Sequence, residues 1–367
     1  MIPRRTFVKF GFSIWWVKPT VAALRQHDFE AAADILADAH EAGDVRAASL
    51  LVKHAGREWA RLIGDCKSDD DAFLIASISK PLSAAALMTL CESHQLSLDD
   101  KVSKFIPEFK GAGRESIDLR QLLTHVCGLP DQLPENASLR KRHAPLSEFV
   151  RHAIRTPLLF RPGSKYSYSS MGILLASEIA QRITDTPFPQ LVKQNVFEPL
   201  GMKHSALGLG DFKLNELMQC QTERAARESG AGDPDAKSWD WNSAYWRSLG
   251  SPWGGVHSTT KDIARFLEAF LHPNDWMSRS LTEAMIRNHN PAGIRSRGLG
   301  FDLGTSTSSE GCSPATFGHG GSTGTLAWAD PVSDTIFVVL TTLPNGAVQS
   351  HPRQQVSDEI AKMISAA

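Results

Sequence analysis

One short motif in this sequence places a serine and a lysine where they can act on each other. Ser77 and Lys80 are the ends of a Ser-Ile-Ser-Lys segment, at the start of a run of small and apolar residues at 76–90 that predicts a buried helix. Residues three apart share one helix face, so the lysine amine would lie beside the serine hydroxyl. Burial lowers the pKa of a lysine, and the amine can then act as a general base for a serine nucleophile. The motif is also frequent by chance, and Ser77 alone could simply cap a helix.

Two later motifs make this pair part of a larger pattern. Tyr-Ser-Ser at 168–170 follows a Pro-Gly turn, and Gly-His-Gly-Gly-Ser at 318–322 precedes a strand-rich stretch. Together with Ser-Ile-Ser-Lys, they resemble the three motifs of the penicillin-recognising serine hydrolases, which include serine β-lactamases, D-alanyl-D-alanine peptidases (penicillin-binding proteins) and related esterases. The resemblance is greatest to the class C-like branch and covers residues 45–345. Four segments between the motifs also resemble that branch, in the same order: 98–102, 122–130, 197–202 and 258–264.

The resemblance implies a catalytic role for each matching residue. Ser77 would be the nucleophile that attacks an acyl carbonyl and forms a covalent acyl-enzyme. Lys80 and Tyr168 would share the acid–base work, and which of them is the general base is left open. The backbone N–H groups of Ser77 and Ser322 would form the oxyanion hole. The resemblance implies no metal ion and no other cofactor.

Four positions of the second and third motifs are expected to contact substrate, and two of them depart from the family's pattern. Gly320 and Gly321 lack side chains, which lets substrate approach the strand closely. Ser170 stands where the family usually has Asn, so its shorter side chain reaches less far toward substrate. His319 stands where β-lactamases and peptidases usually have Lys, and an ordinary histidine is mostly neutral at pH 7. A neutral group there favours neutral acyl esters or amides over carboxylate-bearing substrates.

A rival nucleophile lies in the same region. Residues 320–324 also fit G-x-S-x-G, the nucleophile elbow of α/β-hydrolases. That motif must open a helix, whereas residues 326–330 predict a strand. His351 is the only histidine after Ser322, so the partners for a triad are barely available. Ser77 is therefore the preferred nucleophile.

Other residues that could bind ligands also have structural interpretations. One stretch of the sequence is dense in aromatic residues, which could form either a wall for an acyl group or an anchor for a loop. These residues are Trp239, Trp241, Tyr245, Trp246 and Trp253. His125 has no His, Asp or Glu cluster around it at ligand spacing, which favours a structural role over a metal site. The five cysteines are scattered without a C-x-x-C pair, which favours buried thiols over a disulfide framework.

Hydrophobic periodicity outlines the elements that must position these motifs. Helical spacing predicts a first helix over 29–41 and a last helix over 353–366, and residues 98–246 are mainly helical in pattern. Apolar runs predict strands at 45–52, 58–63, 298–303, 324–330 and 335–342.

With the resemblance, this order implies an α+β fold of the β-lactamase/transpeptidase type, an antiparallel sheet flanked by helices with an inserted all-helical domain. We expect residues 25–97 and 250–367 to form the α/β domain and residues 98–249 to form the helical insertion. The site is expected between the two.

Composition excludes several other classes of protein. The 367 residues carry 39 Lys and Arg against 40 Asp and Glu, a balance that argues against a nucleic-acid partner. No apolar run reaches the roughly 18 residues of a transmembrane helix. Arg4 and Arg5 precede an apolar stretch within residues 1–24, which resembles a twin-arginine export signal. The protein would be exported or periplasmic if that signal is used, and cytoplasmic otherwise.

The sequence thus predicts a serine hydrolase that acts on a small-molecule acyl ester or amide, with an esterase favoured. The alternatives are a β-lactamase or D-alanyl-D-alanine peptidase and, from another class, a non-catalytic acyl-binding or sensor protein. The acyl group, the acceptor of that group and the oligomeric state are left open.

Overall fold

The computed structural model describes residues 24–307 and 309–365. Its framework is a six-stranded antiparallel sheet in the order β2-β1-β9-β8-β7-β6. The strands are β1 (Ala47–His54), β2 (Arg57–Gly64), β6 (Asp302–Leu303), β7 (Phe317–Gly321), β8 (Thr325–Asp330) and β9 (Thr335–Thr341). The sheet therefore joins segments from near both ends of the chain, and β1 pairs directly with β9. The predicted export segment with Arg4 and Arg5 lies outside the described residues.

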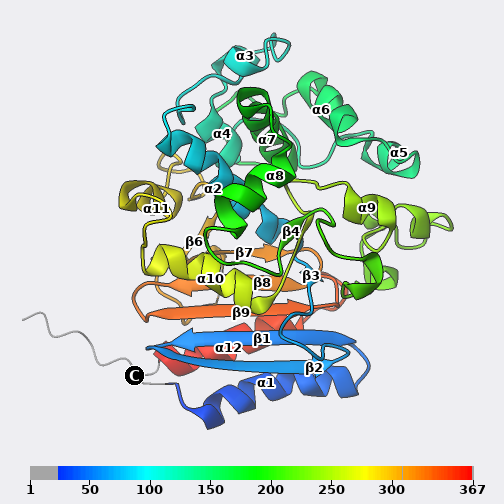
Figure 1. Cartoon of the computed structure of the whole chain (residues 1–367), viewed down its shortest axis with the longest axis vertical. Coiled ribbons are helices and arrows are strands. Elements are labelled where there is room, and N and C mark those ends of the chain that lie inside the picture. The colour runs from blue at the N-terminus through cyan, green and yellow to red at the C-terminus, as the bar shows by residue number, and fades with distance from the viewer. Residues whose placement is uncertain (1–23, 308, 366–367) are drawn as a thin grey trace, which may run out of the picture.

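Alternating side chains explain why this sheet is buried on both faces. Phe337 and Val339 of β9 join one hydrophobic cluster, whereas Val338 and Leu340 join another. Successive side chains of a strand point to opposite faces, so an almost continuous apolar strand requires cover on both sides. One face is covered by α1 (Gln26–Glu41) and α12 (Pro352–Ser365), and the other by α10 (Thr260–Leu271) and the helical region above it (Figure 1).

The helical region is built around one buried helix. That helix is α2 (Ser79–Glu92), and Figure 1 shows most of the others above the sheet. The remaining helices are α3 (Val102–Phe105), α4 (Leu119–Leu123), α5 (Asn136–Lys141), α6 (Leu146–Arg155), α7 (Ser170–Thr184), α8 (Phe188–Val192), α9 (Ala244–Ser248) and α11 (Arg279–Met285).

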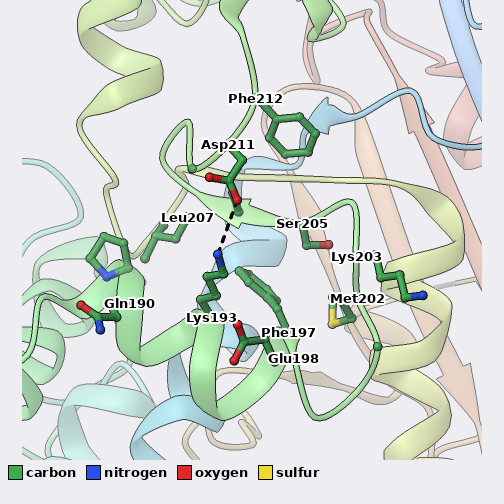
Figure 2. A pocket seen from close by; sticks show the side chains of 14 residues that line it. Gln190, Lys193, Phe197, Glu198, Met202, Lys203, Ser205, Leu207, Asp211 and Phe212 are labelled. Carbon is green, nitrogen blue, oxygen red and sulfur yellow. Dashed lines mark hydrogen bonds and ion pairs between the residues drawn. The ribbon is translucent and has the colours of Figure 1, made fainter.

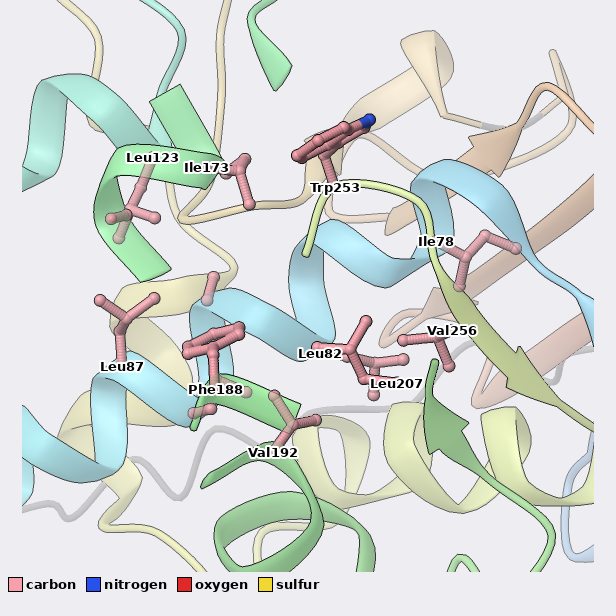
Figure 3. Close-up of a cluster of buried hydrophobic side chains, with 14 of the residues drawn as sticks. Ile78, Leu82, Leu87, Leu123, Ile173, Phe188, Val192, Leu207, Trp253 and Val256 are labelled. Atoms are coloured by element: carbon pink, nitrogen blue, oxygen red, sulfur yellow. The ribbon is translucent and has the colours of Figure 1, made fainter. Parts of the chain in front are cut away.

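The environment of α2 makes it a fixed platform at the junction between the sheet and the helices. Apolar side chains from α4, α7, α8 and two short strands surround it (Figure 3). Leu82 and Leu87 of α2 are fully buried, as are Phe188 and Val256. A helix that is apolar on all sides is expected to be buried in this way.

Several predicted elements are confirmed. Residues 29–41 and 353–366 were expected to be helical and correspond to α1 and α12. The first two strands form a hairpin whose two-residue turn, Ala55-Gly56, has φ values of 49° and 77°. Positive φ at both turn positions matches the right-handed twist of paired strands.

Other elements differ from the prediction. The expected strand at 298–303 is reduced to β6, because Gly300 adopts a φ of +80° and bends the chain. A small second sheet in the order β3-β5-β4 joins β3 (Phe73–Leu74), β5 (Val256–Ser258) and β4 (Ala206–Leu207). The short β4 lies inside the segment expected to be all-helical, and a two-residue strand has no periodicity to detect.

The helices α10 and α11 lie between residue 246, where the predicted helical pattern ends, and residue 298, where the next predicted strand begins, so neither is among the predicted elements. The N-terminus of α10 did carry a signal, because the Thr259 side chain accepts a hydrogen bond from the Asp262 backbone N–H. Thr or Ser three residues before an acidic residue, ahead of an apolar run, is typical of a helix start.

No disulfide links the five cysteines, all of which lie in the described part of the chain. Four of them are buried and Cys91 is half-buried, which agrees with the prediction of buried thiols. Across residues 24–307 and 309–365, no helix combines the length and apolarity needed to cross a bilayer.

Candidate active site

The serine and lysine of the first motif meet at the start of α2. Ser77 lies in a 3₁₀ turn, Ala76–Ile78, that leads into the helix, and its side chain is half-buried. The Lys80 Nζ lies 3.0 Å from the Ser77 Oγ and donates a second hydrogen bond of 2.9 Å to the Trp253 carbonyl oxygen. Lys80 is only 1% exposed. The structure therefore brings the two residues together, as the spacing predicts.

The surroundings of Lys80 change its acidity. Burial lowers the pKa of Lys80 from 10.5 to about 7; the charge of Asp131 opposes this effect and that of Arg297 adds to it. An ammonium ion loses its hydration on burial, which favours the neutral amine. Near pH 7 a substantial fraction of Lys80 can therefore accept a proton.

Tyr168 covers the lysine from the other side. It lies just before α7, whose N-cap residue Ser169 accepts a hydrogen bond from the Gly172 backbone N–H. The Lys80 Nζ is 4.6 Å from the centre of the Tyr168 ring. Burial raises the pKa of Tyr168 well above its usual value, although the charge of Arg297 and a hydrogen bond with Ser77 oppose the shift. The phenol is therefore protonated at neutral pH and can donate a proton.

His125 supports Tyr168. The two rings are 4.6 Å apart, and the His125 Nδ1 accepts a hydrogen bond of 3.2 Å from the Ser169 backbone N–H. His125 is fully buried, and its backbone adopts a φ of +62°. Among the residues that the structure describes, no group of three His, Cys, Asp or Glu is placed to hold a metal ion.

Ser170 is turned toward Asp131, an acid outside the predicted motifs. The Ser170 Oγ donates a 2.6 Å hydrogen bond to Asp131 Oδ1, and the Ser170 backbone N–H donates to the same oxygen at 3.0 Å. Only 2% of Ser170 is exposed. Asp131 also acts on the charge of Lys80, so it links the second motif to the lysine. The contact of Ser170 with substrate stays a prediction.

The third motif forms the end of β7 beside the turn that carries Ser77. A Cβ added to Gly321 would lie 2.4 Å from the Ile75 carbonyl oxygen, so the two backbones are in close contact there. Gly320 is more open, since its nearest neighbours would be 3.8 Å or more from an added Cβ. Ser322 follows β7 in the turn to β8, and its side chain is exposed.

This turn leads into a strand and not into a helix, so the nucleophile-elbow alternative for Ser322 is wrong. The only later histidine, His351, directs its Nε2 to the Leu343 carbonyl oxygen at 2.9 Å.

His319 is held in a buried network of hydrogen bonds. Its Nδ1 is 2.7 Å from the Gly320 carbonyl oxygen, and its Nε2 is 2.8 Å from Arg297 Nη2 and 3.5 Å from the Tyr168 hydroxyl. Burial lowers the pKa of His319 to about 3, although the charge of Asp302 opposes the shift. This shift is in the direction of the neutral histidine that the residue type predicts.

Arg297 and Asp302 complete this network, and neither belongs to a predicted motif. Arg297 is fully buried and forms an ion pair with Asp302 Oδ1. Arg297 lies in the loop before β6 and Asp302 is the first residue of that strand, and this segment carries no catalytic spacing that could reveal them.

The aromatic cluster serves mainly as an anchor. Trp239, Trp241, Trp246 and Trp253 are between 2% and 7% exposed. The Arg140 guanidinium lies 4.8 Å from the Trp239 ring centre and 4.2 Å from that of Trp246. These contacts fix the loop and leave little aromatic surface for a ligand, so the structure favours the anchoring interpretation.

A separate cavity of about 720 Å³ lies next to α8 and β4 (Figure 2). Apolar side chains including Phe197, Met202 and Phe212 line it, and Lys193 faces Asp211 across it at 3.4 Å. None of the predicted catalytic or substrate-binding residues line this cavity.

Comparison with known proteins agrees with the motifs and the fold. The sequence model of the Beta-lactamase family matches residues 32–361. A D-alanyl-D-alanine carboxypeptidase homologue of Salmonella enteritidis PT4 is 27% identical over 309 residues, which are 77% of this chain and 71% of that protein.

Two solved structures are similar in fold. EstCE1, described as a hydrolase with promiscuous acyltransferase activity, has a TM-score of 0.75 and 19% identity, covering 91% of this chain and 99% of its own. The D-amino acid amidase of Ochrobactrum anthropi SV3 has a TM-score of 0.71 and 24% identity, and the match covers 92% of this chain and 99% of the amidase chain. Because the family's sequence model matches most of its length, the chain belongs to the Beta-lactamase family.

Proposed function

We propose that this protein is a serine esterase that forms a covalent acyl-enzyme on Ser77. The observation that carries the proposal is the short contact between the Ser77 hydroxyl and a buried lysine amine, 3.0 Å apart. The lysine pKa of about 7 matches the requirement that a general base be partly neutral at the working pH. A sensor protein that only binds acyl groups has no need of such a base.

In the acylation step, the Ser77 Oγ attacks the carbonyl carbon of the ester while its proton passes to the neutral Lys80 amine. The backbone N–H groups of Ser77 and Ser322 stabilise the negative oxygen that develops. Tyr168 then donates its phenolic proton to the departing alcohol oxygen, and the carbon–oxygen bond of the ester breaks. The raised pKa of Tyr168 supports its assignment as the acid, and the lowered pKa of Lys80 supports its assignment as the base.

In the deacylation step, a water molecule attacks the acyl carbon and gives its proton to the Tyr168 phenolate that acylation left. The bond to the Ser77 Oγ breaks while protonated Lys80 returns its proton to that oxygen, and the acid product leaves. Splitting the reaction into two steps lowers the barrier of each.

The preference for esters is supported by the charge that substrate meets at β7. His319 is neutral because its pKa is lowered to about 3. Arg295, which is more exposed, is paired with Asp302 at 3.2 Å and lies over the Tyr166 ring. A substrate carboxylate therefore meets no unpaired cation of the third motif. Gly320, Gly321 and Ser170 are the remaining residues that we expect next to substrate.

The test is a hydrolysis screen with p-nitrophenyl esters of increasing acyl length, nitrocefin and D-amino-acid amides. We expect the highest kcat/KM on short neutral esters and a mass increase on Ser77 when the acyl-enzyme is trapped. The Ser77→Ala variant is the control, since it should lose both the turnover and the mass increase. Faster cleavage of nitrocefin or of D-amino-acid amides would replace the esterase assignment with one of the activities named for its relatives.

A further inference from the structure

Arg297 is the most completely buried charge next to the site. Its side chain is 0% exposed, and three of its donors are taken, by Asp302 Oδ1, by the Gly300 carbonyl oxygen at 3.1 Å and by His319 Nε2 at 2.8 Å. A guanidinium in a protein keeps its proton and has no acceptor atom. The His319 Nε2 must therefore accept the hydrogen bond from Arg297 and carries no proton.

The other ring nitrogen then determines the tautomer of His319. Its Nδ1 is 2.7 Å from the Gly320 carbonyl oxygen, which can only accept. The single ring proton therefore lies on Nδ1. Protonation of Nε2 would direct two donors at each other, so the imidazole stays neutral as long as Arg297 is in place.

We propose that Arg297, anchored by Asp302, is a positioning residue that holds His319 in its neutral Nδ1–H form and supplies permanent positive charge beside Tyr168. The Arg297 Cζ is 5.7 Å from the Tyr168 ring centre. Lys80 is the other group at that ring that can be a cation, but it is neutral before it accepts the Ser77 proton and charged only afterwards. The charge of Arg297 persists through the reaction, in a position that substrate does not reach.

The groups around His319 define what a loss of Arg297 would do. The charge of Lys80 acts on it from α2, the Tyr168 hydroxyl lies 3.5 Å away in the segment before α7, and Asp302 Oδ2 lies 3.7 Å away at the start of β6. Without Arg297, Asp302 would keep only the more exposed Arg295 as a partner, at 3.2 Å, and as a less neutralised carboxylate it would favour the imidazolium. The charge at His319 would then depend on pH in the range where the wild-type residue stays neutral.

Long-range ¹H–¹⁵N spectra of the full chain with ¹⁵N-labelled histidine test the tautomer directly. His319 is identified by comparison with His319→Gln. We expect an Nδ1–H signature that does not titrate between pH 5 and 8. A proton on Nε2, or a titration midpoint within that range, would overturn the proposal without any Arg297 variant having to fold.

Variants of Arg297 test its effect on catalysis. In Arg297→Met we expect His319 to titrate between about pH 5 and 8. We also expect kcat/KM on p-nitrophenyl butyrate to fall about tenfold to a hundredfold, which is the scale of one charged hydrogen bond. Arg297→Lys retains the charge and should keep His319 neutral and recover most of the rate. An Arg297→Met enzyme with unchanged spectra and pH profile would refute the role. This catalytic part rests on the proposed esterase function; if no ester is cleaved, the spectra still decide the tautomer.

Discussion

The two serines that the motifs place at the site should respond differently to the loss of their hydroxyls. Ser77 provides a side-chain nucleophile, whereas we assign only the backbone N–H of Ser322 to the oxyanion hole, and alanine retains that group. We expect Ser77→Ala to abolish ester turnover and Ser322→Ala to keep most of it. Steady-state kinetics on both purified variants is the measurement, and the reverse ranking would disprove the assignment.

The pH dependence of the rate should report the protonation of Lys80. The neutral amine is the reactive form, and burial lowers its pKa to about 7. Below that pH the neutral fraction falls about tenfold per pH unit, so kcat/KM should rise with pH up to about 7 and then level off. Profiles from pH 5 to 9 on p-nitrophenyl butyrate test this; a flat profile would remove Lys80 as the base.

A change of charge at His319 should alter substrate preference. In His319→Lys the new ammonium would lie close to the Arg297 guanidinium, which is 2.8 Å from the native Nε2. Like charges at that distance repel, so we expect the single variant to be destabilised. Combined with Arg297→Met, the lysine should raise the kcat/KM ratio of nitrocefin to p-nitrophenyl butyrate about tenfold to a hundredfold. An unchanged ratio in the folded double variant would show that charge at this position does not set the preference.

At the scale of elements, β7 offers a matched pair of glycines. A Cβ at Gly321 would lie 2.1 Å from Thr325 Oγ1 and 2.4 Å from the Ile75 carbonyl oxygen, whereas at Gly320 nothing is closer than 3.8 Å. Gly321→Ala should therefore separate β7 from the Ser77 turn, with a lower Tm and little activity. Gly320→Ala should keep the wild-type Tm and lower kcat/KM only if substrate lies along the strand. Thermal melts with kinetics distinguish the two effects, and equal Tm values would contradict the close contact.

The elements that the sequence predicted well are those with strong periodicity or a defined turn. The helix α1 and the β1–β2 hairpin were expected almost at their observed positions, because apolar spacing and Gly56 define them. The missed elements depend on distant contacts. Strand β4 exists because β5 runs beside it, and β6 pairs with only two residues of β7.

The same difference applies to the site. Ser77 and Lys80 were predicted to meet because one helical turn joins them. By contrast, Asp131 reaches Ser170 across 39 positions in the sequence, and Arg297 reaches His319 across 22. No local sequence pattern encodes such contacts, so only the three-dimensional structure reveals which charges in the site neutralise each other.

At the scale of the whole molecule, the thiols should take no part in the chemistry. Burial raises the pKa of Cys66 and Cys91 to about 12 and that of Cys127 and Cys220 to about 11. Thiolates are the reactive form, and very little would be present at pH 7. We expect iodoacetamide to leave esterase activity intact while the unfolded protein is alkylated readily. Rapid inactivation of the native enzyme would contradict this.

The pairing of β1 with β9 also sets the order of events during biosynthesis. Residues of β1 pair with residues 335–341, so a ribosome that has finished the first hairpin must translate most of the chain before its partner strand emerges. At about 5–20 residues per second this takes on the order of tens of seconds, during which an apolar strand edge is open to neighbouring chains. Ser77 is likewise made long before Ser322. A nascent chain should therefore need protection from aggregation, and it should acquire hydrolytic competence only when its last strands have joined the sheet.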